Sequence, residues 1–250
     1  MPRESKAAKR QRAQEIYKRL EKAYPNATTE LRWSNPLELL VATILSAQCT
    51  DERVNKVTEH LFKKYRTAED YANADPEEFQ DEIRSTGFFR NKTKAIIGAA
   101  KMIVEQFGGK VPDNMDDLLK LPGVSRKTAN VVLTAGFGIP SGIVVDTHVH
   151  RVAIRLGLVP KTEKNPAKVE QRLMELFDQD QWIEVSHALV LHGRYVCTAR
   201  KPRCEDCILE DLCPKVGVET KKKAAAKKST SKATAKKSAG GKKSAGRGGS

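Results

Sequence analysis

Four cysteines near the C-terminal end of the sequence have the spacing of a metal centre. They lie in CTARKPRCEDCILEDLC with the spacing C-x6-C-x2-C-x5-C, as Cys197, Cys204, Cys207 and Cys213. Four thiolates so close in sequence can surround one tetrahedral centre, which is either a structural zinc ion or an iron–sulfur cluster. Spacing alone leaves the metal open. The fifth cysteine, Cys49, is predicted to be a small core residue.

The segment between the first two of these cysteines is basic. It contains Arg200, Lys201 and Arg203. Ligation of a metal by the cysteines on either side would hold this loop rigid on the surface, where it could contact a phosphate backbone. The loop is therefore predicted to bind nucleic acid.

A second candidate for chemistry is Lys127, in the stretch LPGVSRKTANVV of residues 121–132. The pattern predicts a helix, a hairpin turn and a second helix that begins near Arg126. The turn exposes the N–H groups of Gly123 and Ser125 beside the positive end of that helix, so the segment could bind phosphate. A primary amine attacks as the neutral base, and the helix N-terminus, Arg126 and partial desolvation favour that form. A solvated lysine in an ordinary turn is the competing interpretation.

Asp146 stands where the apolar stretch GIVV gives way to a helical pattern. It is predicted to be the N-cap of that helix. A capping carboxylate is held rigidly, and the helix dipole favours its negative charge. It could therefore also stabilise positive charge on a sugar or accept a proton.

Helices must position these residues, because helical periodicity runs through the sequence and period-2 alternation is nearly absent. The fold class is therefore all-α. One helix, in SNPLELLVATILSAQ, is apolar on nearly all sides and should be buried, with Ser34 as its cap and Pro36 in its first turn. The other predicted helices span residues 7–24, 52–65, 75–85, 91–106, 114–121, 126–136, 147–156, 166–177 and 181–193.

The positive charge is concentrated at the C-terminal end. The 250 residues carry a formal charge of +14, but residues 221–250 hold 11 Lys and Arg and no acidic residue. The remaining 34 basic and 31 acidic residues leave only +3. Because residues 221–250 have no Leu, Ile, Val or aromatic side chain, residues 216–250 are predicted to form a disordered lysine-rich tail. The tail would bind a polyanion in a salt-sensitive way, or would only keep the protein soluble.

The sequence contains no segment that predicts a membrane protein. The N-terminus lacks the apolar region of a secretory signal, and the longest apolar stretch is LLVATIL at residues 39–45. A bilayer requires roughly 20 apolar residues. We therefore expect a soluble, cytoplasmic protein with no membrane partner.

Three motifs, in the order in which they follow one another along the chain, resemble the endonuclease III family of DNA glycosylases. The resemblance rests on the helix–hairpin–helix around Lys127, the loop and aspartate in FGIPSGIVVDTHVHRVAIRLG, and the cysteine spacing. It implies a two-lobed helix–hairpin–helix DNA glycosylase fold with a [4Fe-4S] cluster loop. Its parts would be a six-helix domain of residues 29–139, a terminal helical and cluster domain of residues 1–28 plus 140–215, and the tail of residues 216–250.

The resemblance also implies a reaction. The protein would be a bifunctional base-excision repair enzyme that removes oxidised pyrimidines from duplex DNA and cleaves the strand by β-elimination, as an AP lyase. Lys127 would attack C1′ of a flipped nucleotide, Asp146 would assist departure of the base, and the four cysteines would ligate a [4Fe-4S] cluster. The partner would be double-stranded DNA with damaged bases or abasic sites, bound by a monomer associated with the nucleoid.

Further residues would contact DNA. Gln48 matches the residue that fills the gap left by the flipped base, and Phe88 stands at the wedge position, which is usually aliphatic. Family members usually have a second hairpin glycine where this sequence has Ser125, so a positive φ there would strain the serine by about 1 kcal/mol. The hairpin and basic-loop contacts would be Leu121, Gly123, Ser125, Arg126, Arg200, Lys201 and Arg203.

Two alternatives compete with this interpretation. Mismatch adenine glycosylases share the cluster loop and the aspartate, but they lack the nucleophilic lysine and carry an extra C-terminal domain. A non-enzymatic DNA-binding module with structural zinc would keep the hairpin only to hold phosphates. An iron–sulfur protein absorbs at about 400 nm, whereas a zinc protein is colourless.

Overall fold

The computed structural model describes residues 4–25 and 27–218, and every regular element in these two ranges is a helix. The all-α prediction is confirmed. The predicted tail lies outside the described residues from residue 219 onward. No helix in the described ranges is both long enough and apolar enough to cross a lipid bilayer.

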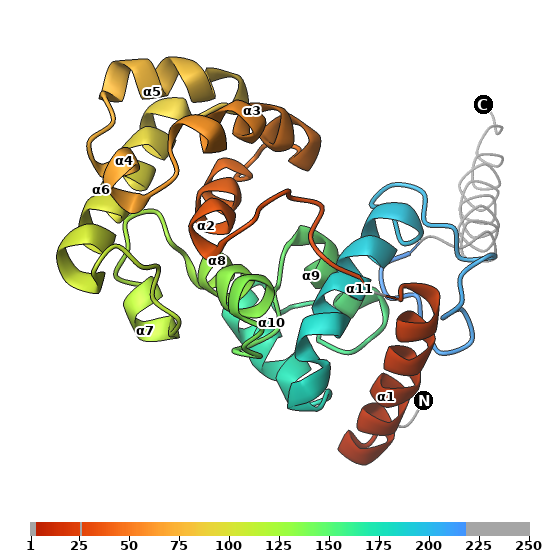
Figure 1. The fold of residues 1–250 in the computed structure, drawn as a ribbon. Coiled ribbons are helices and arrows are strands. Elements are labelled where there is room, and N and C mark those ends of the chain that lie inside the picture. The colour runs from red at the N-terminus through yellow and green to blue at the C-terminus, as the bar shows by residue number, and fades with distance from the viewer. Residues whose placement is uncertain (1–3, 26, 219–250) are drawn as a thin grey trace, which may run out of the picture.

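The elements follow one another in the order that Figure 1 labels. They are α1 (Lys6–Ala23), α2 (Pro36–Leu45), α3 (Asp51–Lys64), α4 (Ala68–Ala72), α5 (Pro76–Ile83), η1 (Arg84–Thr86), α6 (Phe89–Phe107), α7 (Met115–Leu118), α8 (Arg126–Val131), η2 (Val132–Gly136), α9 (Thr147–Arg155), α10 (Pro166–Met174), η3 (Gln179–Gln181) and α11 (Trp182–Tyr195).

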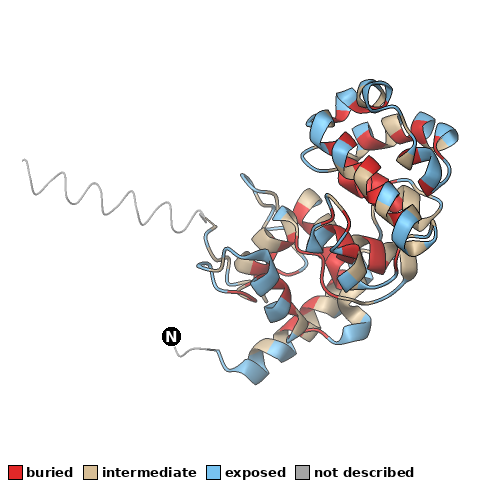
Figure 2. Ribbon diagram, turned by 90° about the vertical axis from the view of Figure 1, so that its left-hand side faces the viewer, coloured by how far each residue is buried: buried red, intermediate tan, exposed pale blue. Residues whose placement is uncertain are grey.

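Buried apolar side chains form two clusters, and each lies inside one half of the molecule (Figure 2). The first cluster draws its residues from Leu31 to Leu133. The second joins residues of α1 to the chain between Ile143 and Leu209. The N-terminal helix α1 packs against α11, so the two ends of the described chain build one half and the middle builds the other. The division into residues 29–139 and a terminal domain stays a prediction.

Helix α2 lies at the centre of the molecule, between the two groups of helices (Figure 1). All its residues from Leu39 to Leu45 are buried, as its apolar sequence predicts. Its N-cap is Asn35, whose side chain accepts from the Glu38 N–H at 3.0 Å. The prediction of Ser34 as the cap is therefore wrong. With Pro36 at the first helical position, the residue directly before it becomes the cap, and Ser34 instead donates to the Glu38 carboxylate.

Two predicted helices differ from the structure in ways that affect the hairpin. The helix predicted over 126–136 is the short α-helix α8 followed by the π-helix η2. A π-helix is rare and often marks a functional site. The helix predicted over 114–121 is the single turn α7, so the chain is already in the hairpin turn at Leu121.

Helix α4 lies outside every predicted helix. It has one turn, which is too short to show a helical period, but it packs closely against α6. Its sequence signal is a capping box, in which Thr67 and Asp70 each accept a hydrogen bond from the other's backbone N–H.

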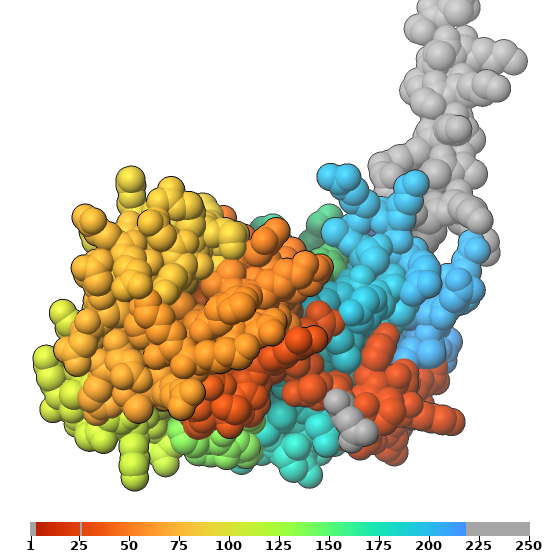
Figure 3. Space-filling view, turned by 45° about the horizontal axis from the view of Figure 1, so that its top comes forward, coloured from red at the N-terminus to blue at the C-terminus, as the bar shows by residue number. Residues whose placement is uncertain are grey.

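The cysteine segment and helices α3 to α5 lie on different sides of the molecule. In Figure 3 the orange and yellow side chains of α3 to α5 form one side of the molecule, and the blue cysteine segment lies beside the red α1 on the other. The basic loop predicted from the cysteine spacing is therefore on an outer surface, within the half that the chain ends build.

Candidate active site

Lys127 is the second residue of α8, and its side chain is exposed. The helix begins here because Ser125 caps it, with its Oγ accepting from the Thr128 N–H at 3.3 Å. Ser125 has a φ of −86°, in extended backbone. The condition under which Ser125 would be strained is therefore not met, because the hairpin needs no second left-handed residue at this position.

The left-handed residue of the hairpin is Gly123, with a φ of 76°. A Cβ there would lie 2.5 Å from the Cβ of Ala95, so the hairpin packs directly against α6 and only glycine fits. The side chain of Leu121 is 2% exposed and belongs to the first hydrophobic cluster. The predicted DNA contact of Leu121 is thereby limited to its backbone, because its side chain fills the core.

Asp146 is the N-cap of α9, as its position in the sequence predicts. Its Oδ1 accepts from the N–H groups of His148 and Val149, both at 2.8 Å. These two bonds hold one carboxylate oxygen and fix the side chain. Asp146 is half-buried.

One pocket brings Lys127 and Asp146 together, although 19 residues of sequence separate them. It is lined from both halves of the molecule, with Ser46 following α2 and His187 coming from α11. Burial lowers the pKa of His187, which keeps its imidazole neutral. The pocket therefore offers an amine, a carboxylate and neutral polar groups to a ligand that enters between the halves.

Arg126 does not line this pocket and binds Glu170 of α10. The Arg126 guanidinium donates to the Glu170 carboxylate at 2.7 and 3.2 Å, and the buried Asn130 amide donates to it at 2.8 Å. These hydrogen bonds raise the pKa of Arg126. The predicted DNA contact of Arg126 stays a prediction, and in the structure a buried carboxylate pairs with its charge. This ion pair ties α8 to the other half.

Gln48 and Phe88 share an unusual backbone conformation. Their φ values are 54° and 49°, and the other non-glycine residue with a positive φ in the described chain is Lys215. Both side chains are exposed, Phe88 to 62%. Left-handed backbone is costly for residues with a Cβ and is concentrated at functional sites. Two short loops thus present an amide and an aromatic ring to solvent.

The four cysteines of the predicted metal centre line one pocket. No three of the described His, Cys, Asp and Glu side chains are arranged to hold a single metal ion. Four cysteine thiolates that line one pocket are a donor set suited to an iron–sulfur cluster as well as to a zinc ion. Backbone N–H groups of Leu209 and Lys215 donate to cysteine sulfurs at 3.4 Å, which helps to compensate thiolate charge.

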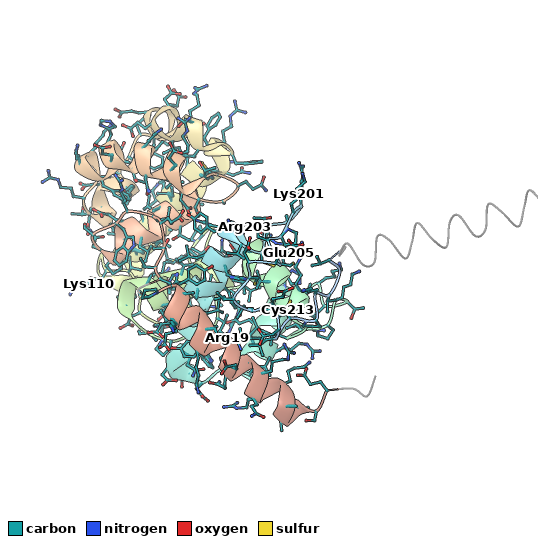
Figure 4. All side chains as sticks on the ribbon, turned by 90° about the vertical axis from the view of Figure 1, so that its right-hand side faces the viewer. Arg19, Lys110, Lys201, Arg203, Glu205 and Cys213 are labelled. Carbon is teal, nitrogen blue, oxygen red and sulfur yellow. The ribbon has the colours of Figure 1, made fainter. Side chains whose placement is uncertain are left out.

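The basic loop is held by an arginine that sequence reasoning missed. Arg155 of α9 donates to the carbonyls of Thr198 and Ala199 at 2.7 and 2.8 Å, and to the Cys197 Sγ at 3.4 Å. The helical position of Arg155 gave no signal for this role, because the loop is 42 residues away. Figure 4 shows Lys201 projecting away from the molecule.

The other two basic-loop residues are exposed as well, but they are placed differently. Arg200 is exposed directly before Lys201 in the loop. Arg203 donates from its guanidinium to the Tyr195 carbonyl, which turns the side chain back towards α11. The phosphate contacts predicted for Arg200, Lys201 and Arg203 stay a prediction.

Comparison with known proteins identifies the family of this chain. Residues 41–179 match the model of the HhH-GPD superfamily of base excision DNA repair proteins. Residues 197–213 match the iron-sulfur binding domain of endonuclease III. The chain belongs to the endonuclease III family. It is a base-excision DNA glycosylase with AP lyase activity.

Relatives in the family match almost over their full length. Endonuclease III of Synechocystis sp. is 55% identical over 208 residues, which are 83% of this chain and 94% of the relative. Endonuclease III of Escherichia coli K12 is 44% identical over 199 residues, or 80% and 93% of the two chains. The resemblance predicted from the motifs is confirmed.

Solved structures of endonuclease III share the fold. A trapped endonuclease III–DNA covalent intermediate, in an estranged-adenine complex, superposes with a TM-score of 0.79 at 44% identity and covers 82% of this chain and 96% of its own. A non-covalent endonuclease III–DNA complex has a TM-score of 0.78 at the same identity, with 82% and 95% covered. The predicted helix–hairpin–helix DNA glycosylase fold is thereby confirmed.

Family membership also settles the cofactor. The cysteine segment is an endonuclease III iron–sulfur domain, so the predicted [4Fe-4S] cluster is confirmed, and the zinc-binding module is not favoured. The mismatch adenine glycosylase alternative is not favoured either, because the relatives are endonuclease III proteins.

Proposed function

We propose that this enzyme removes oxidised pyrimidines from duplex DNA with Lys127 as its nucleophile. The Lys127 Nζ attacks C1′ of the flipped nucleotide, the bond between C1′ and the base breaks, and the base leaves with a proton. Opening of the sugar gives a protonated imine between Lys127 and C1′. Loss of a C2′ proton then breaks the bond from C3′ to oxygen, which cleaves the strand on the 3′ side.

The observation that carries this proposal is the shared pocket of Lys127 and Asp146. Because two backbone N–H groups fix one Asp146 oxygen, its carboxylate is preorganised beside the sugar site. There it stabilises the positive charge that develops as the base leaves, and it accepts and returns protons. The pocket's neutral His187 and Ser46 offer hydrogen bonds to the flipped base.

Gln48 and Phe88 are proposed to enter the DNA where the base has left. Base flipping needs side chains that occupy the vacated stack. An exposed amide can pair with the base whose partner has been flipped out, and an exposed aromatic ring can insert between neighbouring bases. Both stand on loops whose backbone is left-handed. The estranged-adenine complex of a similar endonuclease III is consistent with such an arrangement.

The remaining DNA contacts come from the hairpin and the basic loop. The N–H groups of Gly123 and Ser125 would hold phosphate at the start of α8. Arg200 and Lys201 would add salt-sensitive contacts on a loop that Arg155 and the cluster ligands keep rigid. The four ligands would be Cys197, Cys204, Cys207 and Cys213. The substrate would be duplex DNA with a damaged base or an abasic site, and the enzyme would act as a monomer.

Borohydride trapping tests the proposal. Wild-type protein, Lys127→Ala and the control Lys110→Ala would be incubated with duplex DNA containing thymine glycol and then reduced. Lys110 is an exposed lysine in the loop after α6, so its loss should leave the reaction unchanged. We expect a covalent protein–DNA adduct with the wild type and the control, and none with Lys127→Ala.

Each other outcome has a defined meaning. Base release without a wild-type adduct would show that water, and not Lys127, is the nucleophile. An adduct that persists in Lys127→Ala would place the amine elsewhere. Neither adduct nor base release, on this and other oxidised pyrimidines, would contradict the proposed substrate class.

A further inference from the structure

One lysine is buried in the half of the molecule that carries Gln48 and Phe88. Lys92, in the first turn of α6, is 4% exposed. Its Nζ donates to the carbonyls of Leu45 and Thr86, each at 2.8 Å. A buried ammonium is expensive unless hydrogen bonds compensate it, so a lysine at a core position calls for an explanation.

The two carbonyls that Lys92 binds are both at helix ends. Leu45 is the last residue of α2, and Thr86 is the last residue of η1. The final carbonyls of a helix have no partner within it, and the negative end of the helix dipole favours a cation. Lys92 therefore caps two helices at once with one nitrogen.

Each capped helix leads directly into one of the two left-handed loops. Gln48 follows Leu45 by three residues, and Phe88 follows Thr86 by two. Two 2.8 Å bonds from a single nitrogen keep the two carbonyl oxygens within twice that distance of each other. The two hydrogen bonds of one side chain thus fix the spacing between the helix ends from which the two loops start.

We propose that Lys92 is a positioning residue that fixes the relative placement of the Gln48 and Phe88 loops for entry into DNA. This inference rests on the proposed function, because it assumes that both side chains occupy the vacated stack. An insertion into one base-pair step has to meet both strands in register, so a small change in loop spacing would misplace both side chains. Misplacement by about 1 Å can cost a catalytic step about 100-fold.

The chemistry around Lys92 agrees with a fixed role. Burial lowers the pKa of Lys92, because the ammonium loses its hydration in the core and its charged form carries a cost. If the position served the core alone, a methionine would fill the same space without that cost. The left-handed φ at Gln48 and at Phe88 adds strain that the surroundings must hold in place.

The first experiment compares Lys92→Met with the control Lys101→Met. Lys101 is an exposed lysine on the same helix. Single-turnover release of thymine glycol would be measured, with the amount of competent enzyme determined by borohydride trapping at saturating DNA. We expect the rate per competent enzyme to fall by about 10- to 100-fold in Lys92→Met and to stay unchanged in the control. A rate unchanged per competent enzyme would overturn the inference.

A double-mutant cycle separates positioning from general damage. Gln48→Ala and Phe88→Ala would each be made in the wild type and in Lys92→Met. If Lys92 acts through the two loops, each alanine substitution that slows the wild type by about tenfold should slow Lys92→Met by less than about threefold. If the alanine substitutions slow Lys92→Met by the same factor as they slow the wild type, Lys92 acts independently of the loops, and the inference is overturned.

The cycle also keeps the two proposals apart. Should neither alanine variant slow the wild type, the proposed roles of Gln48 and Phe88 would be wrong, and the inference about Lys92 would be wrong with them. Circular dichroism and the cluster absorbance would report whether each variant folds. If Lys92→Met does not fold, the same cycle would use Lys92→Gln, which retains a donor but is one atom shorter, with the same expected and contradicting results.

Discussion

The ion pair between α8 and α10 makes an asymmetric prediction about stability. The Glu170 carboxylate is 5% exposed and accepts three hydrogen bonds, two from Arg126 and one from Asn130. The Arg126 side chain is 45% exposed. Removal of the arginine therefore leaves a buried carboxylate with a single donor, whereas removal of the carboxylate leaves a guanidinium that water can reach.

The two single variants should differ for this reason. An uncompensated buried charge costs about 3–5 kcal/mol, and exposure of the arginine argues for the lower end, so Arg126→Met should lower the free energy of unfolding by about 3 kcal/mol. Glu170→Gln keeps the shape and an oxygen for Asn130, and should cost only about 1 kcal/mol. In the double variant no charge is left unpaired. Its loss in the free energy of unfolding should therefore be about 1–2 kcal/mol smaller than the sum of the losses in the two single variants.

Urea unfolding, followed by circular dichroism and by the cluster absorbance, measures these differences. For an m-value of about 2–3 kcal/mol/M, the midpoint for Arg126→Met should fall by about 1 M. The reasoning would be refuted if Arg126→Met cost no more than Glu170→Gln, because the carboxylate would then be hydrated rather than buried. It would also be refuted if the double variant showed the sum of the single effects.

Three further predictions follow from other parts of the molecule. Gly123→Ala should destabilise the protein by about 3 kcal/mol in thermal unfolding, because its Cβ would collide with Ala95, whereas Gly138→Ala, also at positive φ but with open space around it, should cost only about 1 kcal/mol. Equal costs would contradict the close contact with α6. Burial lowers the pKa of His187 in the folded protein. The contribution of the neutral His187 to the free energy of unfolding should therefore be complete above about pH 6.5, the pKa of an unfolded histidine, and should decline as the pH falls towards the pKa of the folded state. Between about pH 7 and pH 5, the free energy of unfolding measured in urea titrations should therefore fall less in His187→Gln than in the wild type. An equal fall in both proteins would contradict the lowered pKa of His187. Deletion of residues 221–250 should weaken DNA binding mainly at low salt and flatten its salt dependence in fluorescence anisotropy, and an unchanged slope would refute this.

The local chemistry of the site could be predicted because it depends on short stretches of sequence. Asp146 is a helix cap for the reason its neighbours indicate, and the cysteine spacing leads to one pocket. Ser125 shows the limit of this reasoning. The missing second glycine left open whether position 125 needs a positive φ. In the structure a serine in extended backbone caps α8 there, and Gly123 makes the turn.

Contacts between distant segments could not be predicted. Arg155 holds the cysteine loop from another helix, and Glu170 takes up the charge of Arg126 across 44 residues of sequence. Glu170 lies outside every motif, and Arg155 lies in FGIPSGIVVDTHVHRVAIRLG only as one more polar residue of the predicted helix. A polar side chain on a helix gives no sign of which loop or partner the fold will bring to it.

The sequence by itself determined the all-α class, most helix positions, the family and the residue types of the site, because helical period, caps, turns and ligand spacing act over a few residues. Only the tertiary structure decided how Lys127 and Asp146 meet in one pocket, and how Lys92 ties together the loops of Gln48 and Phe88. These arrangements depend on the packing of two hydrophobic clusters built from segments far apart in the chain. Burial and hydrogen-bond partners at such places are properties of the whole fold.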